Sequence, residues 1–398
     1  MILDELIPTR EIEQRRQLIR DVMDYKLDDH DHIPILITHF PNSNGYTLTE
    51  VYKNKKIQLE YELDKIKSSL IKVPGGDYIP SIKPDLGYVV IQSIFGMKPV
   101  YSSDKKPAKY PDQTPYVDPL TKPIKSIEDM YKLKRPEDIF SRGLVPEGLE
   151  RIRYMMDATN FEIPASNLDC GNGFMMAYEI TETELFFTTM RDDPKAILHM
   201  IDIITDIIID IESEVIKIAG GIDNITSTEW DEKWLPEGKK CLISADLQPL
   251  YSPSDYYIFD LPYCNRQFRK FGPGFIHNCG PQTALKHFWD HSPKPYGITC
   301  EYYSCISNYK RIKEVFSRHH KAVIIVEFTN MKDSDEMCAA FKNLMDILAP
   351  DVIAIPWMWI GPVHICQEDP AVINNKLMKI SKEYMKRMRI VKINRRGI

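Results

Sequence analysis

The chain has 398 residues, of which 43% are hydrophobic and 27% charged, with a formal net charge of −6. These proportions are typical of a globular protein with a large core, and they exclude a disordered chain or a fibre. The acidic balance argues against nucleic-acid binding, which would require a basic stripe. The eight cysteines are scattered and the chain shows no secretion signal. We therefore expect a cytoplasmic enzyme with reduced thiols.

The first third of the chain is expected to contain an N-terminal helical extension, a strand, a long helix and another strand. These elements cover residues 1–30 (with a helix at 11–27), 33–37, 47–71 and 88–91. Residues 98–125 are rich in Pro, Lys, Asp and Tyr and have no periodicity. Loops of that length are uncommon inside compact domains, so this stretch is interpreted as a surface excursion.

From residue 147 onward, predicted helices and buried strands alternate regularly. The helices cover residues 147–158, 196–218, 254–271, 283–290, 308–319, 333–347 and 370–388, and the strands cover 162–168, 241–245, 274–277, 297–299, 322–328 and 352–356. This alternation implies parallel β/α units, and seven or eight units favour an α/β fold of the closed (β/α)8 TIM barrel type, with residues 1–398 as one domain. No glycine-rich nucleotide-binding motif follows any of the strands.

The helix at residues 196–218 is rich in isoleucine, which raises the question of a membrane span. Asp202, Asp206, Asp210 and Glu214 recur every four residues and therefore share one helical face. Four carboxylates are too costly inside a bilayer. We interpret this face as solvated and expect no membrane association.

In a parallel barrel the chemistry lies where strands end, and the strand at 274–277 ends in His277-Asn278-Cys279-Gly280. His277 and Cys279 alternate in an extended segment, so their side chains point the same way. An imidazole and a thiolate at this spacing can bind zinc if a third ligand comes from elsewhere. Cys366, after the last strand, is the leading candidate, and His364 competes with it. The alternative is a buried cysteine beside a hydrogen-bonded histidine.

Other chemistry-bearing residues follow other strands. Asn167, Cys170 and Asn172 lie at the end of the strand at 162–168 and are assigned as candidate substrate-binding residues. Trp357, in the last strand, is either core or pocket wall, and we include it in the same group. No Gly-x-Ser-x-Gly elbow occurs, so serine hydrolase chemistry finds no support.

Residues 241–280 contain Ser244-Ala245-Asp246-Leu247, Leu261-Pro262-Tyr263 and His277-Asn278-Cys279-Gly280. This pattern resembles the uroporphyrinogen decarboxylase superfamily, which includes the cobamide (corrinoid)-dependent methyltransferases. The resemblance spans nearly the whole chain and implies a (β/α)8 barrel with its pocket at the C-terminal ends of the strands. It also implies that Tyr178 is a pocket tyrosine, and we assign Tyr178 and Asp246 as candidate catalytic residues.

Two features favour the methyltransferase branch. The decarboxylases carry an arginine-rich segment after the first strand, whereas residues 38–45 here contain no arginine. The methyltransferases carry His-x-Cys and a distant Cys as zinc ligands, an order that His277, Cys279 and Cys366 match. The resemblance implies zinc, a corrinoid carried by a partner protein, and a small-molecule methyl donor or acceptor.

Two alternatives to the methyltransferase remain open. One is a metal-free decarboxylase that uses Tyr178 and Asp246, and the other is a non-catalytic ligand-binding barrel. A homodimer is a possible assembly for any of the three.

Overall fold

Six parallel strands form the centre of the computed structural model, which describes residues 7–42, 45–101, 114–292, 295–318, 322–362 and 364–395. Their order in the sheet is β1-β8-β7-β6-β5-β4, so the first and last strands of the chain are neighbours. The strands are β1 (Leu36–His39), β4 (Cys241–Ser244), β5 (Gly274–His277), β6 (Pro295–Glu301), β7 (Val323–Glu327) and β8 (Ile353–Ile360). Every residue of β1, β4, β5 and β7 is buried, as expected for parallel strands covered on both faces.

Short parallel contacts extend this arrangement beyond β4. Ala165 bridges both Ile82 and Ile225, and the Thr228 amide donates a 2.9 Å hydrogen bond to the Lys240 carbonyl just before β4. The strand expected at residues 162–168 is therefore present only as these bridges at Ala165. The fold is α/β with a mainly parallel sheet, and the described residues form regular ladders only within the six strands and one small hairpin.

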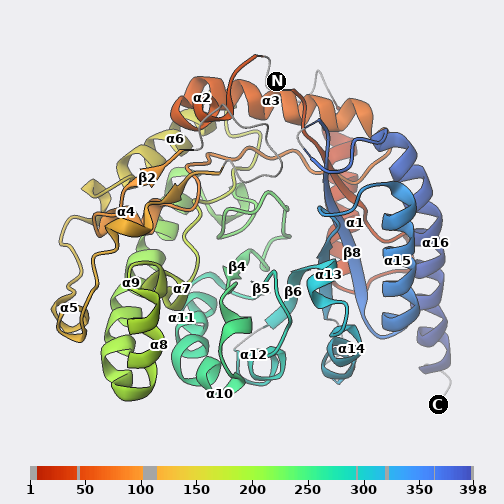
Figure 1. Cartoon of the computed structure of the whole chain (residues 1–398). Helices are drawn as coiled ribbons and strands as arrows, with labels where there is room; N and C mark the ends of the chain where they lie inside the picture. The colour runs from red at the N-terminus through yellow and green to blue at the C-terminus, as the bar shows by residue number, and fades with distance from the viewer. Residues whose placement is uncertain are drawn as a thin grey trace.

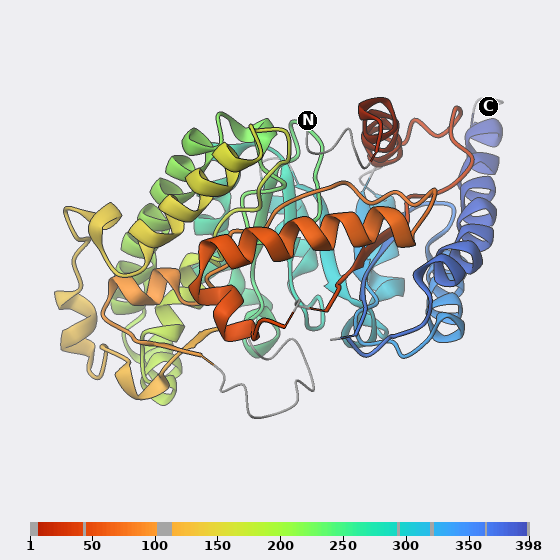
Figure 2. The same ribbon diagram turned by 90° about the horizontal axis from the view of Figure 1, so that it is seen from above.

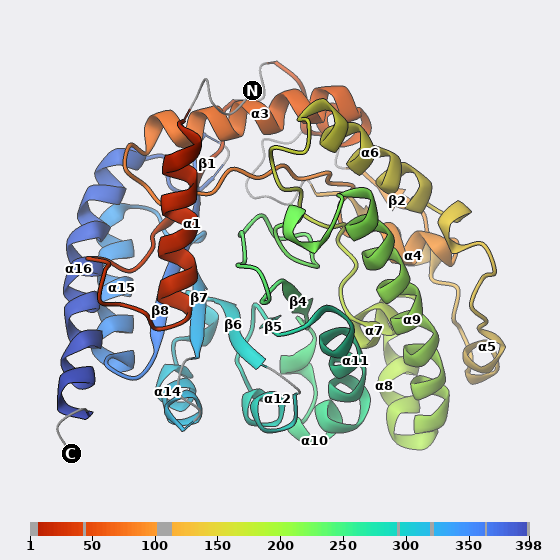
Figure 3. The same cartoon turned by 180° about the vertical axis from the view of Figure 1, so that it is seen from behind.

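Helices lie around the outside of the strands (Figures 1 and 3). The longer ones are α1 (Thr9–Met23), α3 (Lys55–Lys72), α6 (Val145–Ala158), α8 (Thr183–Asp192), α9 (Pro194–Ile218), α11 (Leu261–Phe271), α14 (Tyr309–Ser317), α15 (Ser334–Leu348) and α16 (Pro370–Arg395). The short ones are α2 (Leu48–Lys53), α4 (Val90–Ile94), α5 (Ile127–Lys132), α7 (Gly173–Glu179), α10 (Pro253–Asp255), α12 (Leu285–His291) and α13 (Tyr302–Cys305). Viewed from above, α3 crosses the structure between α6 and α16 (Figure 2).

The expected helix over residues 47–71 is two helices, because two caps lie within it. The Thr47 side chain and Glu50 form a capping box that starts α2. Asn54 ends α2, and its side chain accepts hydrogen bonds from the Lys56 and Ile57 amides to start α3. A side chain that binds the backbone in this way favours a new helix start over continuation.

The expectation of a strand at residues 88–91 is wrong, because Val90–Ile94 forms α4. Every residue of α4 is buried, so the apolar run carries no amphipathic period that could separate a helix from a strand. Gly87, with φ of 80°, turns the chain immediately before this helix.

The acidic face of α9 is occupied by ion pairs. Asp202 and Asp206 both pair with Arg266 of α11, and Asp210 pairs with Arg135. These acids remain 40% to 62% exposed at their side chains, in agreement with a solvated face. Among the described helices, α9 included, none is both long and apolar enough to cross a membrane.

The excursion predicted at residues 98–125 is described only at its two ends. There β2 (Pro99–Val100) pairs antiparallel with β3 (Tyr116–Val117), so the segment begins and ends as a short hairpin. Residues 102–113 lie outside the described part of the chain.

Gly274→Ala is expected to destabilise the fold, because β5 passes too close to β4 for a side chain. A Cβ at Gly274 would lie 1.6 Å from the Cys241 carbonyl oxygen, so the backbone would have to move. Overpacking of this kind costs about 1–3 kcal/mol or more. Thermal unfolding should show a lower melting temperature, whereas the exposed Lys270→Ala control on α11 should not. An unchanged melting temperature for Gly274→Ala would contradict this packing.

Candidate metal centre

Three potential metal ligands meet at the C-terminal ends of β4 and β5. Asp246 follows β4 by two residues, His277 ends β5, and Cys279 follows it by two residues. One ligand atom from each lies within 4.8 Å of the other two. His277 Nε2 is 3.1 Å from Cys279 Sγ and 3.5 Å from Asp246 Oδ1. The parallel register of Ser244 with His277 brings these two strand ends side by side.

Hydrogen bonds fix the loop that carries Cys279. The Cys279 amide donates to Asp246 Oδ1 at 2.7 Å, which ties this loop to the end of β4. The Asn278 side chain donates to Gln248 Oε1 at 2.8 Å and accepts from the Gly280 amide at 2.6 Å. His277 is buried, Asp246 is partly exposed and Cys279 is exposed, so the cluster is open to solvent on one side.

The second nitrogen of His277 faces the neighbouring strands. Its Nδ1 lies 2.6 Å from Thr299 Oγ1 on β6 and 3.8 Å from Glu327 Oε1 on β7. Burial tends to raise the pKa of Glu327, but the 3.1 Å ion pair with Lys233 outweighs it and the pKa is lowered. A histidine held in this way presents Nε2 to the cluster. Metal-ligating histidines characteristically use the other ring nitrogen for such a contact.

The chemistry of the three side chains fits zinc, which takes nitrogen, sulfur and carboxylate oxygen ligands. The residue is exposed as a whole, but desolvation of the Cys279 sulfur, together with the nearby Asp246 and Glu327 carboxylates, raises the pKa of this thiol above its ordinary value. The thiol therefore stays protonated near neutral pH unless a cation is placed beside it. A divalent metal ion is such a cation.

The structure does not bring Cys366 into this group. Cys366 is buried in the loop after β8, where its carbonyl accepts a hydrogen bond from the Gly361 amide at 3.1 Å. His364 is also outside the group and packs on Phe40, with ring centroids 4.6 Å apart. Burial lowers the pKa of His364 to about 4. Among the described residues, the third potential ligand beside His277 and Cys279 is Asp246, not a residue of this loop.

Most of the candidate residues at 167–178 are occupied by contacts within the fold. Asn172 caps α7 and donates to Asp260, and Cys170 is fully buried, so both support the fold. Tyr178, on α7, accepts a hydrogen bond from Thr183, and its ring faces Lys122. Asn167 differs from the others, because its side-chain nitrogen is buried without a hydrogen-bond partner.

Trp357 belongs to a group of tryptophans near the cluster. It is buried, its ring lies 3.5 Å from Lys233 Nζ, and its centroid is 4.8 Å from that of Trp359. Trp230 joins this group, with its ring centroid 6.4 Å from both Trp359 and His277.

Trp230, Lys233 and Glu327 were not predicted from the sequence. Trp230 and Lys233 lie in the run Glu229-Trp230-Asp231-Glu232-Lys233-Trp234, which is almost wholly buried although four of its six residues are charged. Charged residues are rarely buried without a partner or a function. A charged run that includes two tryptophans was therefore the sequence signal that could have identified Trp230 and Lys233 as candidate site residues.

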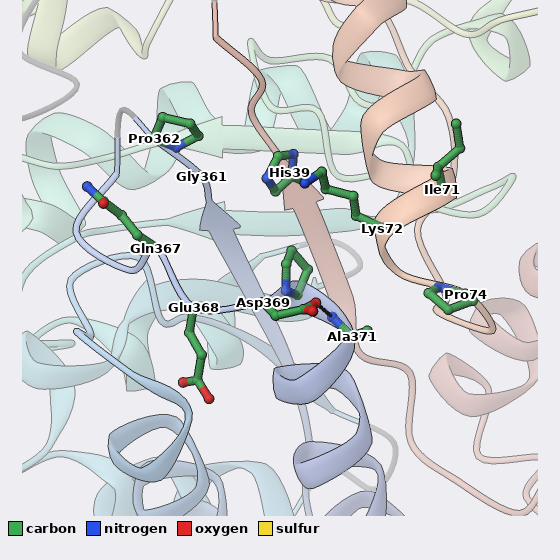
Figure 4. A pocket seen from close by; sticks show the side chains of 11 residues that line it. His39, Ile71, Lys72, Pro74, Gly361, Pro362, Gln367, Glu368, Asp369 and Ala371 are labelled. Carbon is green, nitrogen blue, oxygen red and sulfur yellow. Dashed lines mark hydrogen bonds between the residues drawn. The ribbon is translucent and has the colours of Figure 1, made fainter.

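A separate cavity of about 620 Å³ lies beside β1 and β8. Figure 4 shows His39 and Gly361 at the ends of these two strands, with Lys72 from α3 beside His39 and Asp369 at the start of α16. The His39 ring is held by a 2.7 Å hydrogen bond with Ser68 of α3. None of the three clustered ligands lines this cavity.

Comparison with known proteins finds likeness at the level of structure. No protein-family model and no curated protein matches the sequence. Among solved structures, a methyltransferase from Methanosarcina mazei superposes with a TM-score of 0.63 and 16% sequence identity. The match covers 92% of this chain and 98% of the other. The two proteins therefore share a fold over nearly their whole length.

Proposed function

We propose that this protein is a zinc-dependent methyltransferase that moves a methyl group between a small substrate and a corrinoid carried by a partner protein. The observation that carries the proposal is the convergence of Asp246, His277 and Cys279 at adjacent strand ends. The likeness to a methyltransferase of the same fold supports the reaction class. We also propose that the strands and the Ala165 bridges form a (β/α)8 barrel, because the helices surround them on all sides (Figure 3).

Some residues at the cluster would bind the metal, and others orient the metal-binding histidine. His277, Cys279 and a third residue, Asp246 or Cys366, would hold the metal. When bound there, zinc supplies Lewis-acid chemistry that lowers the pKa of a substrate thiol or polarises a leaving oxygen. Thr299 and Glu327 hold the His277 ring so that Nε2 faces the cluster. The solvent-exposed side of the cluster would give the substrate and the corrinoid access to the metal.

Glu327→Gln and Thr299→Val are expected to weaken zinc binding, because each alters the contact at His277 Nδ1. Loss of such a partner typically costs about 10–100-fold in metal affinity. Competition with a chromophoric chelator would measure this change without requiring activity. Glu336→Gln on α15, whose side chain accepts hydrogen bonds from Tyr303 and from the Lys332 amide, is the control. Wild-type zinc affinity in both Glu327→Gln and Thr299→Val would remove the orienting role.

Metal analysis of the purified protein tests the proposal as a whole. We expect about one zinc per chain, and methyl transfer to or from free cobalamin that depends on this zinc. If protein prepared without chelators does not contain a stoichiometric amount of metal, the metal-free decarboxylase is favoured.

A further inference from the structure

The residues around the proposed metal centre carry an excess of carboxylates. Asp85, Glu229 and Asp246 lie near Asp169. The Glu229 side chain accepts a 3.4 Å hydrogen bond from the Ser244 amide at the end of β4, and Asp231 and Glu327 form ion pairs with Lys233. Two lysines oppose these six acids. Lys83 is paired with Asp85 at 2.7 Å, and Lys233 with Asp231 and Glu327.

Neither Asp169 nor Glu229 forms an ion pair with another described residue. The Asp169 side chain is half-buried; burial raises its pKa, Lys83 opposes the rise, and Asp85 and Asp246 add to it. Glu229 is fully buried, and one of its carboxylate oxygens has no hydrogen-bond partner. A positive charge nearby stabilises the ionised form of such buried, unpaired carboxyl groups.

Aromatic rings beside the same acids already bind ammonium groups. Lys83 Nζ lies 4.7 Å from the centre of the Trp230 ring, and Lys233 Nζ lies 3.5 Å from that of Trp357. Trp230 and Trp359 are both partly exposed, and Trp230 is next to His277. Tryptophan faces flanked by carboxylates are the usual surroundings of a bound ammonium ion.

Beside these acids, the described lysines Lys83 and Lys233 are both paired, so neither is free to bind an anionic substrate. No arginine occurs at the strand ends, in residues 36–45, 82–88, 165–173, 225–234, 244–250, 277–283, 299–305, 327–332 or 357–368. Recognition of a carboxylate, sulfonate or phosphate normally uses arginine or an unpaired lysine.

We propose that the substrate carries an ammonium group, which binds beside Trp230 and Asp169 while its thiol or oxygen faces His277 and Cys279. The inference rests on the proposed function for the role of that thiol or oxygen. The ammonium site rests on the acids and tryptophans alone. The substrate class is thus a small thiol, alcohol or ether that bears an ammonium group a few bonds away.

Three probes of nearly equal shape test the charge. Choline carries a trimethylammonium group, 3,3-dimethylbutan-1-ol is its neutral counterpart, and 2-hydroxyethanesulfonate carries an anionic group at the same position. Calorimetry with zinc-loaded and zinc-free protein should show choline binding about tenfold or more tighter than the alcohol, because a desolvated cation gains from the rings and carboxylates. The anion should bind most weakly. Equal binding of choline and the alcohol, tighter binding of the anion, or no binding of choline would overturn the proposal.

Two variants change the affinity for choline in opposite directions. Asp169→Asn should weaken choline binding severalfold and leave the alcohol unchanged. Lys83→Met should strengthen choline binding, because it frees the Trp230 face and leaves Asp85 unpaired. A site built for anions predicts the reverse for Lys83→Met, so that result would overturn the proposal. Asp346→Asn, on α15 and paired with Arg387, is the matched control.

Zinc content separates the two proposals. If the protein binds choline selectively but holds no zinc, the ammonium site stands and the zinc-dependent function fails. If it holds zinc but does not prefer choline over the alcohol, the function stands and the ammonium site fails.

Discussion

Cys279→Ala is expected to remove both zinc and methyl transfer from a protein that stays folded. The Cys279 sulfur is one of three ligand atoms within 4.8 Å of each other, and two remaining ligands rarely hold zinc in a catalytic geometry. Loss of the Lewis acid removes several kcal/mol of transition-state stabilisation, so transfer should fall by about a thousandfold or more. Cys279 is exposed in the loop after β5, so its replacement should leave the core unchanged.

Atomic absorption, a transfer assay and circular dichroism on the same preparation measure the three effects. Cys338→Ala, on α15, is the control and should retain zinc and activity. Retention of full zinc by Cys279→Ala would exclude this cysteine as a ligand.

The third ligand is decided by a second pair of variants. Asp246→Asn should lose zinc if Asp246 completes the group, as its 3.5 Å approach to His277 favours. Cys366→Ala should lose zinc if the loop after β8 supplies the ligand, as the resemblance implies. Loss in one variant and retention in the other assigns the ligand directly.

Lys65→Met is expected to cause the largest loss of stability. Lys65 of α3 is fully buried, with Nζ 2.6 Å from Glu62 and 2.8 Å from Glu232. It joins α3 to residue 232, whose carbonyl accepts a hydrogen bond from Ser81. Removing one partner of a buried ionic group costs about 3–5 kcal/mol, because the remaining charges are left uncompensated.

The cost of Lys65→Met should depend on pH. Burial already raises the pKa of Glu62 above its ordinary value, Lys65 opposes the rise, and Glu232 adds to it. A raised pKa means that the contribution of Glu62 to stability is present below the unfolded pKa and is lost as pH rises through the folded one. Without Lys65 the pKa rises further. The deficit should therefore be larger at about pH 8 than at about pH 5, as measured by urea unfolding.

The triple variant Lys65→Met/Glu62→Gln/Glu232→Gln is the matched control. It removes the charges together and should recover much of the loss, since neutral replacement of a whole buried ionic group is often tolerated. A Lys65→Met protein as stable as wild type at both pH values would contradict the role of this triad.

The sequence by itself determined the alternation of helices and parallel strands, and the end of β5 at His277. These features depend on local periodicity and on side chains that alternate along one extended segment, so no tertiary information was needed. The same local rules failed at residues 88–91, where a fully buried apolar run has no period to separate α4 from a strand.

Only the tertiary structure decided which side chains surround His277. Asp246 enters the cluster because β4 and β5 are paired in parallel register. The position of Cys366 depends instead on the path of the loop after β8. Trp230 and Glu327 reach His277 from segments far apart in the chain. The path of a loop and the packing between distant segments depend on contacts that no local pattern encodes, and the candidate site is built from such contacts.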